Sequence, residues 1–169
     1  MRWLVDGYNV IRRDPELQAR EAESLEAGRR ALLHFIARAH RASRDEFTVV
    51  FDGARPSGGA PTAGRIRVVF SRPPLTADDE LMRFARQMRS GAVVVSSDRK
   101  IQDAARRAGS AVLTAEQFLE ALEVPERSSA PDIKDDSDGE PVRAKRGNPR
   151  RLSKKARKAQ RALGRLRQP

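Results

Sequence analysis

The 169-residue sequence contains no cysteine, which excludes disulfide bonds, thiolate zinc sites and cysteine nucleophiles. No apolar run approaches the roughly 18 residues that span a bilayer, so we expect no membrane partner. The first strand-like segment is interrupted at once by Asp6, which is not the pattern of a signal peptide. The expected location is therefore cytoplasmic.

Several catalytic motifs are absent as well. The two histidines, His34 and His40, lie in one predicted helix at a spacing that turns them to different sides, which disfavours a metal-independent ribonuclease built on paired histidines. Neither Gly-x-x-x-x-Gly-Lys-Ser/Thr nor Gly-x-Gly-x-x-Gly occurs, so no nucleotide cofactor is expected. No Gly-x-Ser-x-Gly elbow of a serine hydrolase occurs either.

Charge is distributed unevenly along the chain. The net charge is +11, yet residues 142–169 hold 12 Lys or Arg and no Asp or Glu, whereas residues 123–141 hold 2 and 7. The periodic apolar pattern stops after residue 124. We therefore expect a domain over 1–124, an acidic disordered linker over 125–141, and a basic tail over 142–169 that is disordered or helical on binding. Such basic density favours nucleic acid or a ribonucleoprotein surface over a solubilising role.

Strand-like and helix-like segments alternate within the first 124 residues. Because most strands are followed by a helix, the pattern predicts an α/β fold with a mainly parallel sheet covered by helices on both faces. The expected strands cover residues 3–6, 47–51, 66–70, 92–96 and 111–113, and the expected helices about residues 23–42, 77–89, 98–108 and 115–122.

The acids gather where the predicted strands end. Asp6 ends the first strand, Asp52 the second, and Asp98 follows the fourth, while Asp78 and Asp79 open the helix after the third. Because the carboxyl ends of parallel strands share one edge of a sheet, we expect these side chains to converge. A carboxylate cluster repels itself unless protons or a cation neutralise it, and oxygen ligands favour Mg²⁺ or Mn²⁺. Such an ion supports phosphodiester hydrolysis.

Each acid also has a structural interpretation. Asp98 is placed to cap a helix, Asp79 to complete a capping box, and Asp52 to form a turn. Asp6 is the hardest to explain in this way, because it ends a buried-looking strand and precedes Asn9, another oxygen ligand, by three residues. The convergence of several acids at one edge is what favours a functional site.

Basic and aromatic residues near the same edge, and in the tail, are candidates for RNA binding, although solvated charge and core packing explain such residues equally well. Cationic side chains grip phosphates, and the Tyr8 ring is suited either to stacking on a base or to packing in the core. The candidates are Tyr8, Arg12, Arg13, Arg55, Arg99, Lys100, Arg150, Arg151, Lys154 and Lys155.

Four segments together resemble one known family. They are Val5-Asp6-Gly7-Tyr8-Asn9-Val10-Ile11, Val49-Val50-Phe51-Asp52-Gly53, Thr76-Ala77-Asp78-Asp79 and Ser96-Ser97-Asp98-Arg99. In this order and spacing they are similar to the YacP-like branch of the NYN domain family, within the wider PIN-like nucleases, over about residues 1–122. The resemblance implies a three-layer sandwich with a five-stranded sheet of order 3-2-1-4-5, and a metal-dependent endoribonuclease whose products carry a 5′-phosphate and a 3′-hydroxyl.

The resemblance also implies the site. It places Asp6, Asn9, Asp78, Asp79 and Asp98 around the metal, with the four aspartates as ligands, and it matches Asp52 to an additional second-strand acid. Some members are similar to factors that cut mRNA on ribosomes, so the ribosome is an expected partner by analogy. The alternatives are a non-catalytic RNA- or ribosome-binding module, and another metal-dependent phosphodiesterase or DNA nuclease on the same fold.

Overall fold

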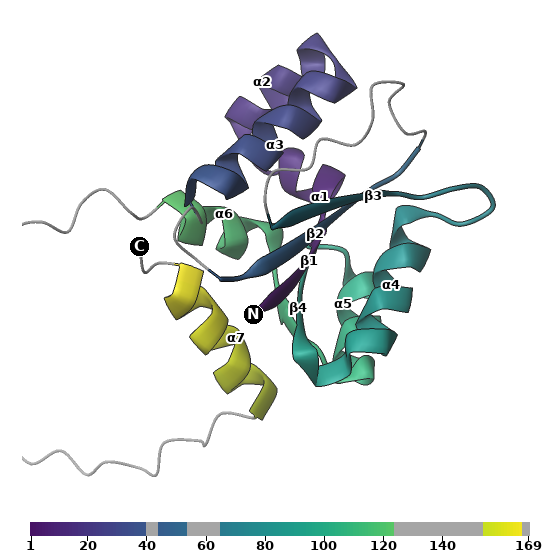
Figure 1. Ribbon diagram of the computed structural model, residues 1–169, viewed down its shortest axis with the longest axis vertical. Helices are drawn as coiled ribbons and strands as arrows, with labels where there is room; N and C mark the ends of the chain where they lie inside the picture. Colours follow the sequence, from purple (N-terminus) through teal and green to yellow (C-terminus); the bar gives the residue numbers. More distant parts are fainter. Residues whose placement is uncertain (40–43, 54–64, 124–153, 167–169) are drawn as a thin grey trace, which may run out of the picture.

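The computed structural model describes residues 1–39, 44–53, 65–123 and 154–166. Its centre is one sheet of five parallel strands in the order β3-β2-β1-β4-β5 (Figure 1). The strands are β1 (Arg2–Asp6), β2 (Glu46–Phe51), β3 (Ile66–Phe70), β4 (Ala92–Val95) and β5 (Ala111–Leu113). The strand order is the one that the family resemblance implies, and β1 lies in the middle of it.

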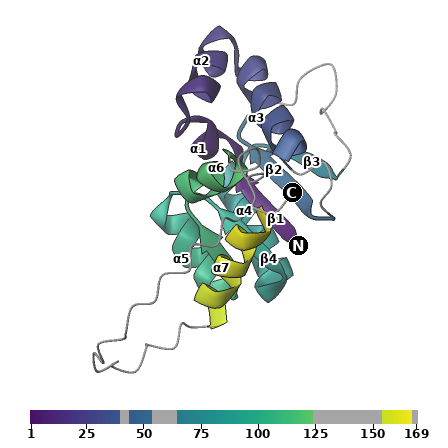
Figure 2. The same ribbon diagram turned by 90° about the vertical axis from the view of Figure 1, so that its left-hand side faces the viewer.

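Helices cover both faces of this sheet, which gives three layers (Figures 1 and 2). One layer holds α1 (Gly7–Ile11), α2 (Pro15–Glu23), α3 (Leu25–Ala39), α6 (Ala115–Glu123) and α7 (Lys154–Leu166), and the other holds α4 (Ala77–Met88) and α5 (Arg99–Ala108), with a short 3₁₀ turn at Arg89–Gly91. Within the described residues, no helix combines the length and apolar character needed to cross a membrane.

The alternation of side chains along the strands builds two apolar cores. Trp3 and Val5 on β1 point into the core beneath α3 and α6, whereas Leu4 between them points into the core beneath α4 and α5. All three side chains are fully buried. A central parallel strand that is apolar on both faces is what the run at 3–5 predicts.

The first helical layer differs from the expectation of a single helix over 23–42. Residues before it form two further helices, α1 and α2. α2 begins at a strong signal: Asp14 accepts a hydrogen bond from the Leu17 backbone N–H at 2.8 Å, and Pro15 is the first helical residue. Leu25, the first residue of α3, is 54% exposed.

The basic segment contributes a helix to the domain, which differs from the expected boundary at residue 124 and from a tail that folds only on binding. α7 lies against α6 and β5. Ala162 is fully buried, and Ala159 and Leu163 pack beside it. Lys158 Nζ donates hydrogen bonds to the backbone oxygens of Ser90 and, at 3.3 Å, Ala92. Small apolar residues between many cations gave only a weak sequence signal for this packing.

Candidate functional site

Asp6 is the centre of the carboxyl edge of the sheet. It ends β1 and is only 9% exposed. The Ser96 hydroxyl donates a hydrogen bond to Asp6 Oδ2 at 2.9 Å, and the Asn9 backbone N–H donates to Asp6 Oδ1 at 3.3 Å. Burial raises the pKa of Asp6 to about 6, and the nearby charges of Asp78 and Asp98 add to this rise, although the two hydrogen bonds oppose it.

Asp98 lies just beyond β4 and caps α5, as its sequence position predicts. Its Oδ1 accepts from the backbone N–H groups of Lys100 at 2.6 Å and Ile101 at 3.2 Å. Its own N–H donates to Ser96 Oγ at 3.1 Å, so one buried hydroxyl contacts both Asp6 and Asp98. In the described part of the chain nothing donates a hydrogen bond to Asp98 Oδ2, which leaves that oxygen for a ligand.

The two acids that open α4 have different surroundings. The pKa of Asp78 is raised, first by desolvation and then by the charges of Asp98, Asp79 and Asp52. Asp79 Oδ2 instead accepts from the backbone N–H and the hydroxyl of Thr76, each at 3.0 Å, in a capping box that lowers the pKa of Asp79. The structure therefore brings Asp78 into the acidic cluster and engages Asp79 in a helix cap.

Asp52 lies on the flank of the cluster. It follows β2 and is exposed, and its Oδ1 accepts hydrogen bonds from the Ser71 hydroxyl and, at 3.1 Å, from the Gly53 backbone N–H. Its hydrogen bond to the next backbone N–H is typical of Asp in turns, as its Asp-Gly sequence suggests, and explains part of its position. Its charge nevertheless reaches Asp78 and raises the pKa of that residue.

Asn9 is fixed by the loop after β4. Its Oδ1 accepts from the Ser97 backbone N–H at 2.8 Å, so its Nδ2 is the group left to donate to a ligand. The Ser97 hydroxyl donates to Glu116 Oε2 at 2.7 Å, and Glu116 forms an ion pair with Arg13 at 3.2 Å. Arg13, a candidate for RNA binding, is therefore partly engaged within the protein.

The other RNA-binding candidates differ in their surroundings, and some lie outside the described residues. Arg12, Arg99 and Lys100 are exposed at this edge, and Lys100 is close enough for its charge to oppose the rise in the pKa of Asp78. Tyr8 is half-buried, with Phe51 edge-on to its ring at a centroid distance of 5.2 Å. Arg55, Arg150 and Arg151 lie outside the described residues, as do the side chains of Lys154 and Lys155.

Gly7, directly after Asp6, lies closely against the ring of Phe51. A Cβ atom at this position would lie 2.2 Å from Phe51 Cε1, well inside van der Waals contact. Only glycine lets the backbone pass this closely over the ring. The Asp-Gly-Tyr-Asn segment thus places Asp6 and Tyr8 on either side of a close contact with β2.

The cluster carries negative charge that the protein does not neutralise. Within the described residues, no Lys or Arg forms an ion pair with Asp6, Asp52, Asp78 or Asp98. The same residues include no group of three or more Asp, Glu or His side chains close enough to hold a metal ion by themselves. The edge therefore presents carboxylates that are spread along it and not gathered into a closed cage.

Two serines and one arginine belong to this region but were not predicted as site residues. Ser96 and Ser71 follow β4 and β3 and bind Asp6 and Asp52, so the rule that located the acids, polar residues directly after strands, also locates them. Arg29, which contacts Tyr8, lies within α3 and carries no comparable sequence signal.

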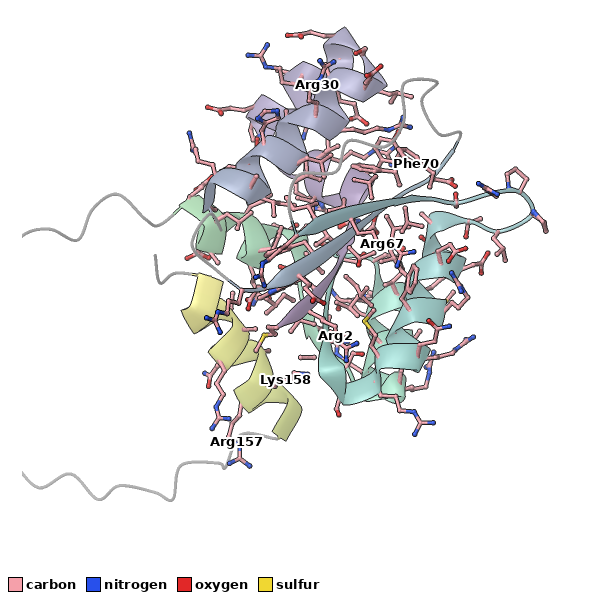
Figure 3. All side chains as sticks on the ribbon, in the orientation of Figure 1. Arg2, Arg30, Arg67, Phe70, Arg157 and Lys158 are labelled. Atoms are coloured by element: carbon pink, nitrogen blue, oxygen red, sulfur yellow. The ribbon has the colours of Figure 1, made fainter. Side chains whose placement is uncertain are left out.

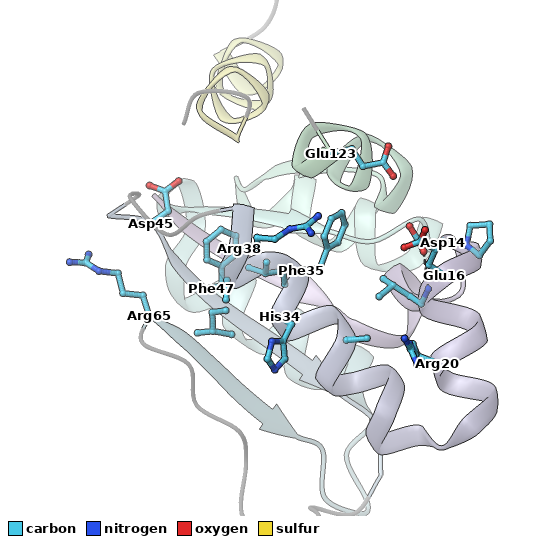
Figure 4. A pocket seen from close by; sticks show the side chains of 16 residues that line it. Asp14, Glu16, Arg20, His34, Phe35, Arg38, Asp45, Phe47, Arg65 and Glu123 are labelled. Atoms are coloured by element: carbon cyan, nitrogen blue, oxygen red, sulfur yellow. Dashed lines mark hydrogen bonds between the residues drawn. The ribbon is translucent and has the colours of Figure 1, made fainter. Parts of the chain in front are cut away.

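A separate hollow lies at the opposite edge of the sheet. This pocket, of about 1310 Å³, is lined by α2, α3 and the amino ends of β2 and β3, with Phe35, Asp45, Phe47 and Arg65 among its walls (Figure 4). None of the clustered acids lines it. We place the functional site at the carboxylates because perturbed acids, and not hollow volume alone, indicate chemistry.

Comparison with known proteins agrees with this geometry. Residues 3–163 match the model of the YacP-like NYN domain. The chain belongs to the YacP-like NYN domain family. It is 31% identical to the uncharacterized protein YacP of Bacillus subtilis (strain 168) over 129 residues. This matched region covers 73% of this chain and 76% of that protein.

Two solved structures of YacP are similar to this chain. The crystal structure of Rae1 (YacP) from Bacillus subtilis has a TM-score of 0.63 and 29% identity, and that of a tryptophan-to-leucine mutant of Rae1 has a TM-score of 0.60 and 27% identity; each comparison covers 73% of this chain and 74% of the other. The NYN family has a PIN-like nuclease fold, so membership supports a nuclease role. The family match also reaches into α7.

Proposed function

We propose that the protein is a metal-dependent endoribonuclease whose site is formed by Asp6, Asp78 and Asp98, with Asn9 beside them. The observation that carries this proposal is the state of Asp6. It is a buried carboxyl with a pKa of about 6, beside two other acids and without a described cationic partner. Burying a carboxylate beside other acids costs stability, and groups with such perturbed pKa values cluster at functional sites.

The residues present suit a hard divalent cation. Asp6 and Asp98 would hold it, with Asp78 as a further ligand, and Mg²⁺ and Mn²⁺ favour carboxylate oxygens. The absence of a closed cage in the described residues fits Mg²⁺ in particular, because this ion is usually held by one or two carboxylates, with water and phosphate oxygens as its other ligands. When bound, such an ion supplies a lowered pKa for water and stabilises charge on a phosphoryl group.

The protein's own groups position the reactants. The Ser96 hydroxyl orients Asp6 and, through the Asp98 amide, fixes the separation of two carboxylates. The Asn9 side chain, held by the Ser97 N–H, directs its Nδ2 as a hydrogen-bond donor toward water or a phosphate oxygen. Hydrolysis at this site gives a 5′-phosphate and a 3′-hydroxyl.

RNA is the proposed substrate because cations flank an open edge. Arg12, Arg99 and Lys100 are exposed beside the acids and are placed to contact the phosphates on either side of the cleaved bond. The basic C-terminal segment raises the local RNA concentration, and its contribution weakens as salt rises. We include mRNA on the ribosome among the proposed substrates.

The test is cleavage of an RNA that contains single-stranded and structured regions, free and as a ribosome-bound message, with Mg²⁺, Mn²⁺ or EDTA. We expect metal-dependent cutting that Asp6→Asn abolishes. The matched control is Asp103→Asn, an exposed acid on α5 that pairs with Arg106, and it should retain activity. Cutting in EDTA, or full activity of Asp6→Asn, would contradict the proposal. RNA binding without cutting would favour the non-catalytic binding module. Cutting of a DNA substrate in a parallel reaction would favour the DNA nuclease.

A further inference from the structure

Arg29 is a buried cation without a described anionic partner. It lies on α3, is 8% exposed, and forms no ion pair with any Asp or Glu in the described ranges. Its guanidinium carbon lies 5.0 Å from the ring centroid of Phe70, 5.4 Å from that of Tyr8 and 5.6 Å from that of Phe51. Cation–π contacts offset part of the cost of burial, but a positive charge held in this way is still complementary to an anion.

The polar contact of Arg29 is the hydroxyl of Tyr8. Arg29 Nε donates to Tyr8 Oη at 2.8 Å, and Nη2 donates to the same oxygen. A tyrosine hydroxyl has two acceptor lone pairs and one proton to donate. Because Arg29 takes the acceptor side, the proton is what Tyr8 has left to offer, and no described residue accepts it. Tyr8 is thus fixed as a hydrogen-bond donor beside a buried positive charge.

This pair lies on the same edge as the carboxylates. Tyr8 follows Asp6 by two residues, Phe51 directly precedes Asp52, and Phe70, labelled in Figure 3, ends β3. The exposed Arg12 lies 5.7 Å from the Tyr8 ring centroid, and it forms no ion pair within the ranges that the structure describes. Two cations therefore contact one tyrosine next to the acidic cluster.

We propose that Tyr8, held by Arg29, binds a non-bridging phosphate oxygen of the RNA chain beside the carboxylate cluster. This inference rests on the proposed function, since it names how the same site holds its substrate. Tyr8 is the contacting residue, and Arg29 is a positioning residue that also contributes positive charge. A phosphate is favoured over a stacked base because Phe51 and the two arginines already occupy the surroundings of the Tyr8 ring.

The experiment measures binding of a short fluorescent single-stranded RNA to the full chain in EDTA, over a series of salt concentrations. Tyr8→Phe keeps the ring and removes only the hydroxyl, and we expect binding about tenfold weaker. Arg29→Met should weaken binding to a similar extent and reduce the slope of log K against log salt by about 0.7, the value for one phosphate contact on a single strand. Arg30→Met is the matched control, since Arg30 is the exposed neighbour on the same helix, away from Phe70 (Figure 3).

Unchanged binding by Tyr8→Phe would overturn the inference, and so would an equal loss in Arg30→Met. If Arg29→Met does not fold, as thermal unfolding would show, Tyr8→Phe decides alone. Cleavage with Mg²⁺ separates this inference from the proposed nuclease. A wild type that binds RNA through Tyr8 but cuts nothing supports the phosphate contact and contradicts the nuclease. A wild type that cuts RNA while Tyr8→Phe binds normally supports the nuclease and contradicts the phosphate contact.

Discussion

The Ser96 hydroxyl donates a hydrogen bond to Oδ2 of Asp6 at 2.9 Å, and this bond joins two buried residues that are 90 positions apart in the sequence. Asp6 ends β1 and Ser96 follows β4, the neighbouring parallel strand. The same hydroxyl accepts the backbone N–H of Asp98 at 3.1 Å. One fully buried serine thus opposes the rise that burial causes in the pKa of Asp6, and it also links Asp6 to the backbone of Asp98.

The first prediction concerns Ser96→Ala. The hydrogen bond from Ser96 holds the pKa of Asp6 down, so its loss should raise that pKa above about 6. The proposed metal site needs Asp6 in its charged form, so we expect the acidic limb of the pH–activity profile to move to higher pH. The free energy of unfolding should fall by about 1–3 kcal/mol, because a buried carboxylate and a backbone amide each lose a partner. Carboxyl NMR titration and pH–rate profiles would measure these effects.

Ser110→Ala is the control for that change. Ser110 is also fully buried, but it donates to the Arg89 carbonyl at 2.7 Å, at the amino end of β5. It should lose about 1 kcal/mol of stability and keep the wild-type pH profile. A Ser96→Ala protein with an unshifted Asp6 titration would show that the hydroxyl does not control this carboxyl group.

The second prediction is that Asp6→Asn stabilises the metal-free protein at neutral pH. The pKa of Asp6 is about 6 in the folded state and 3.8 in the reference state. The folded protein therefore binds the proton more tightly, and stability falls as pH rises from about 4 to about 6. At about pH 7.5, removing the charge should restore up to roughly 3 kcal/mol, less about 1 kcal/mol if one hydrogen bond is lost.

Urea unfolding in EDTA at several pH values would measure this gain. Below about pH 4 the stabilisation by Asp6→Asn should disappear, because Asp6 is then protonated in both states. Asp103→Asn, at an exposed position, should stay within about 0.5 kcal/mol of wild type. A stabilisation that does not depend on pH would mean that packing, and not charge, is its cause.

The third prediction concerns metal removal. If a divalent cation neutralises the cluster, Mg²⁺ or Mn²⁺ should raise the melting temperature of the wild type, and EDTA should reverse the effect. At about 100 times the dissociation constant the stabilisation is about 2.7 kcal/mol. Asp6→Asn should lose most of this response while remaining folded. An equal response in both proteins would place the cation elsewhere.

The acidic edge was predictable because it follows from local rules, whereas the different roles of Asp78 and Asp79 and the position of Arg29 were not. Apolar runs locate the strands, parallel pairing puts their ends together, and Asp6 and Asp98 follow directly. The sequence did not separate Asp78 from Asp79, since both open the same helix and only the fold shows which one faces the other acids. Arg29 could not be found at all, because its surroundings come from α1 and from the ends of β2 and β3, which meet only in the folded protein.

The fourth prediction separates the roles of the two acids on α4. Asp78→Asn should reduce RNA cleavage strongly and leave thermal stability unchanged or slightly higher, because desolvation and then its acidic neighbours raise the pKa of Asp78. Asp79→Ala should lower the melting temperature, because it removes the capping box with Thr76, and should retain more activity. Asp79→Asn would keep an acceptor for Thr76 and should recover part of the lost stability. Equal losses of activity in Asp78→Asn and Asp79→Asn would assign both to the site.

The last prediction tests whether α7 belongs to the domain. Ala162 is fully buried against the core that also contains Phe118 and Trp3, so Ala162→Glu would bury an unpartnered charge or detach the helix. We expect a loss of about 1–3 kcal/mol in the free energy of unfolding. Gln160→Glu introduces the same side chain at an exposed position of α7 and should stay within about 0.5 kcal/mol of wild type. Both variants add one negative charge to the same basic helix. A difference between them in urea unfolding therefore reports the packing of α7, and identical stabilities would mean that the domain ends before this helix.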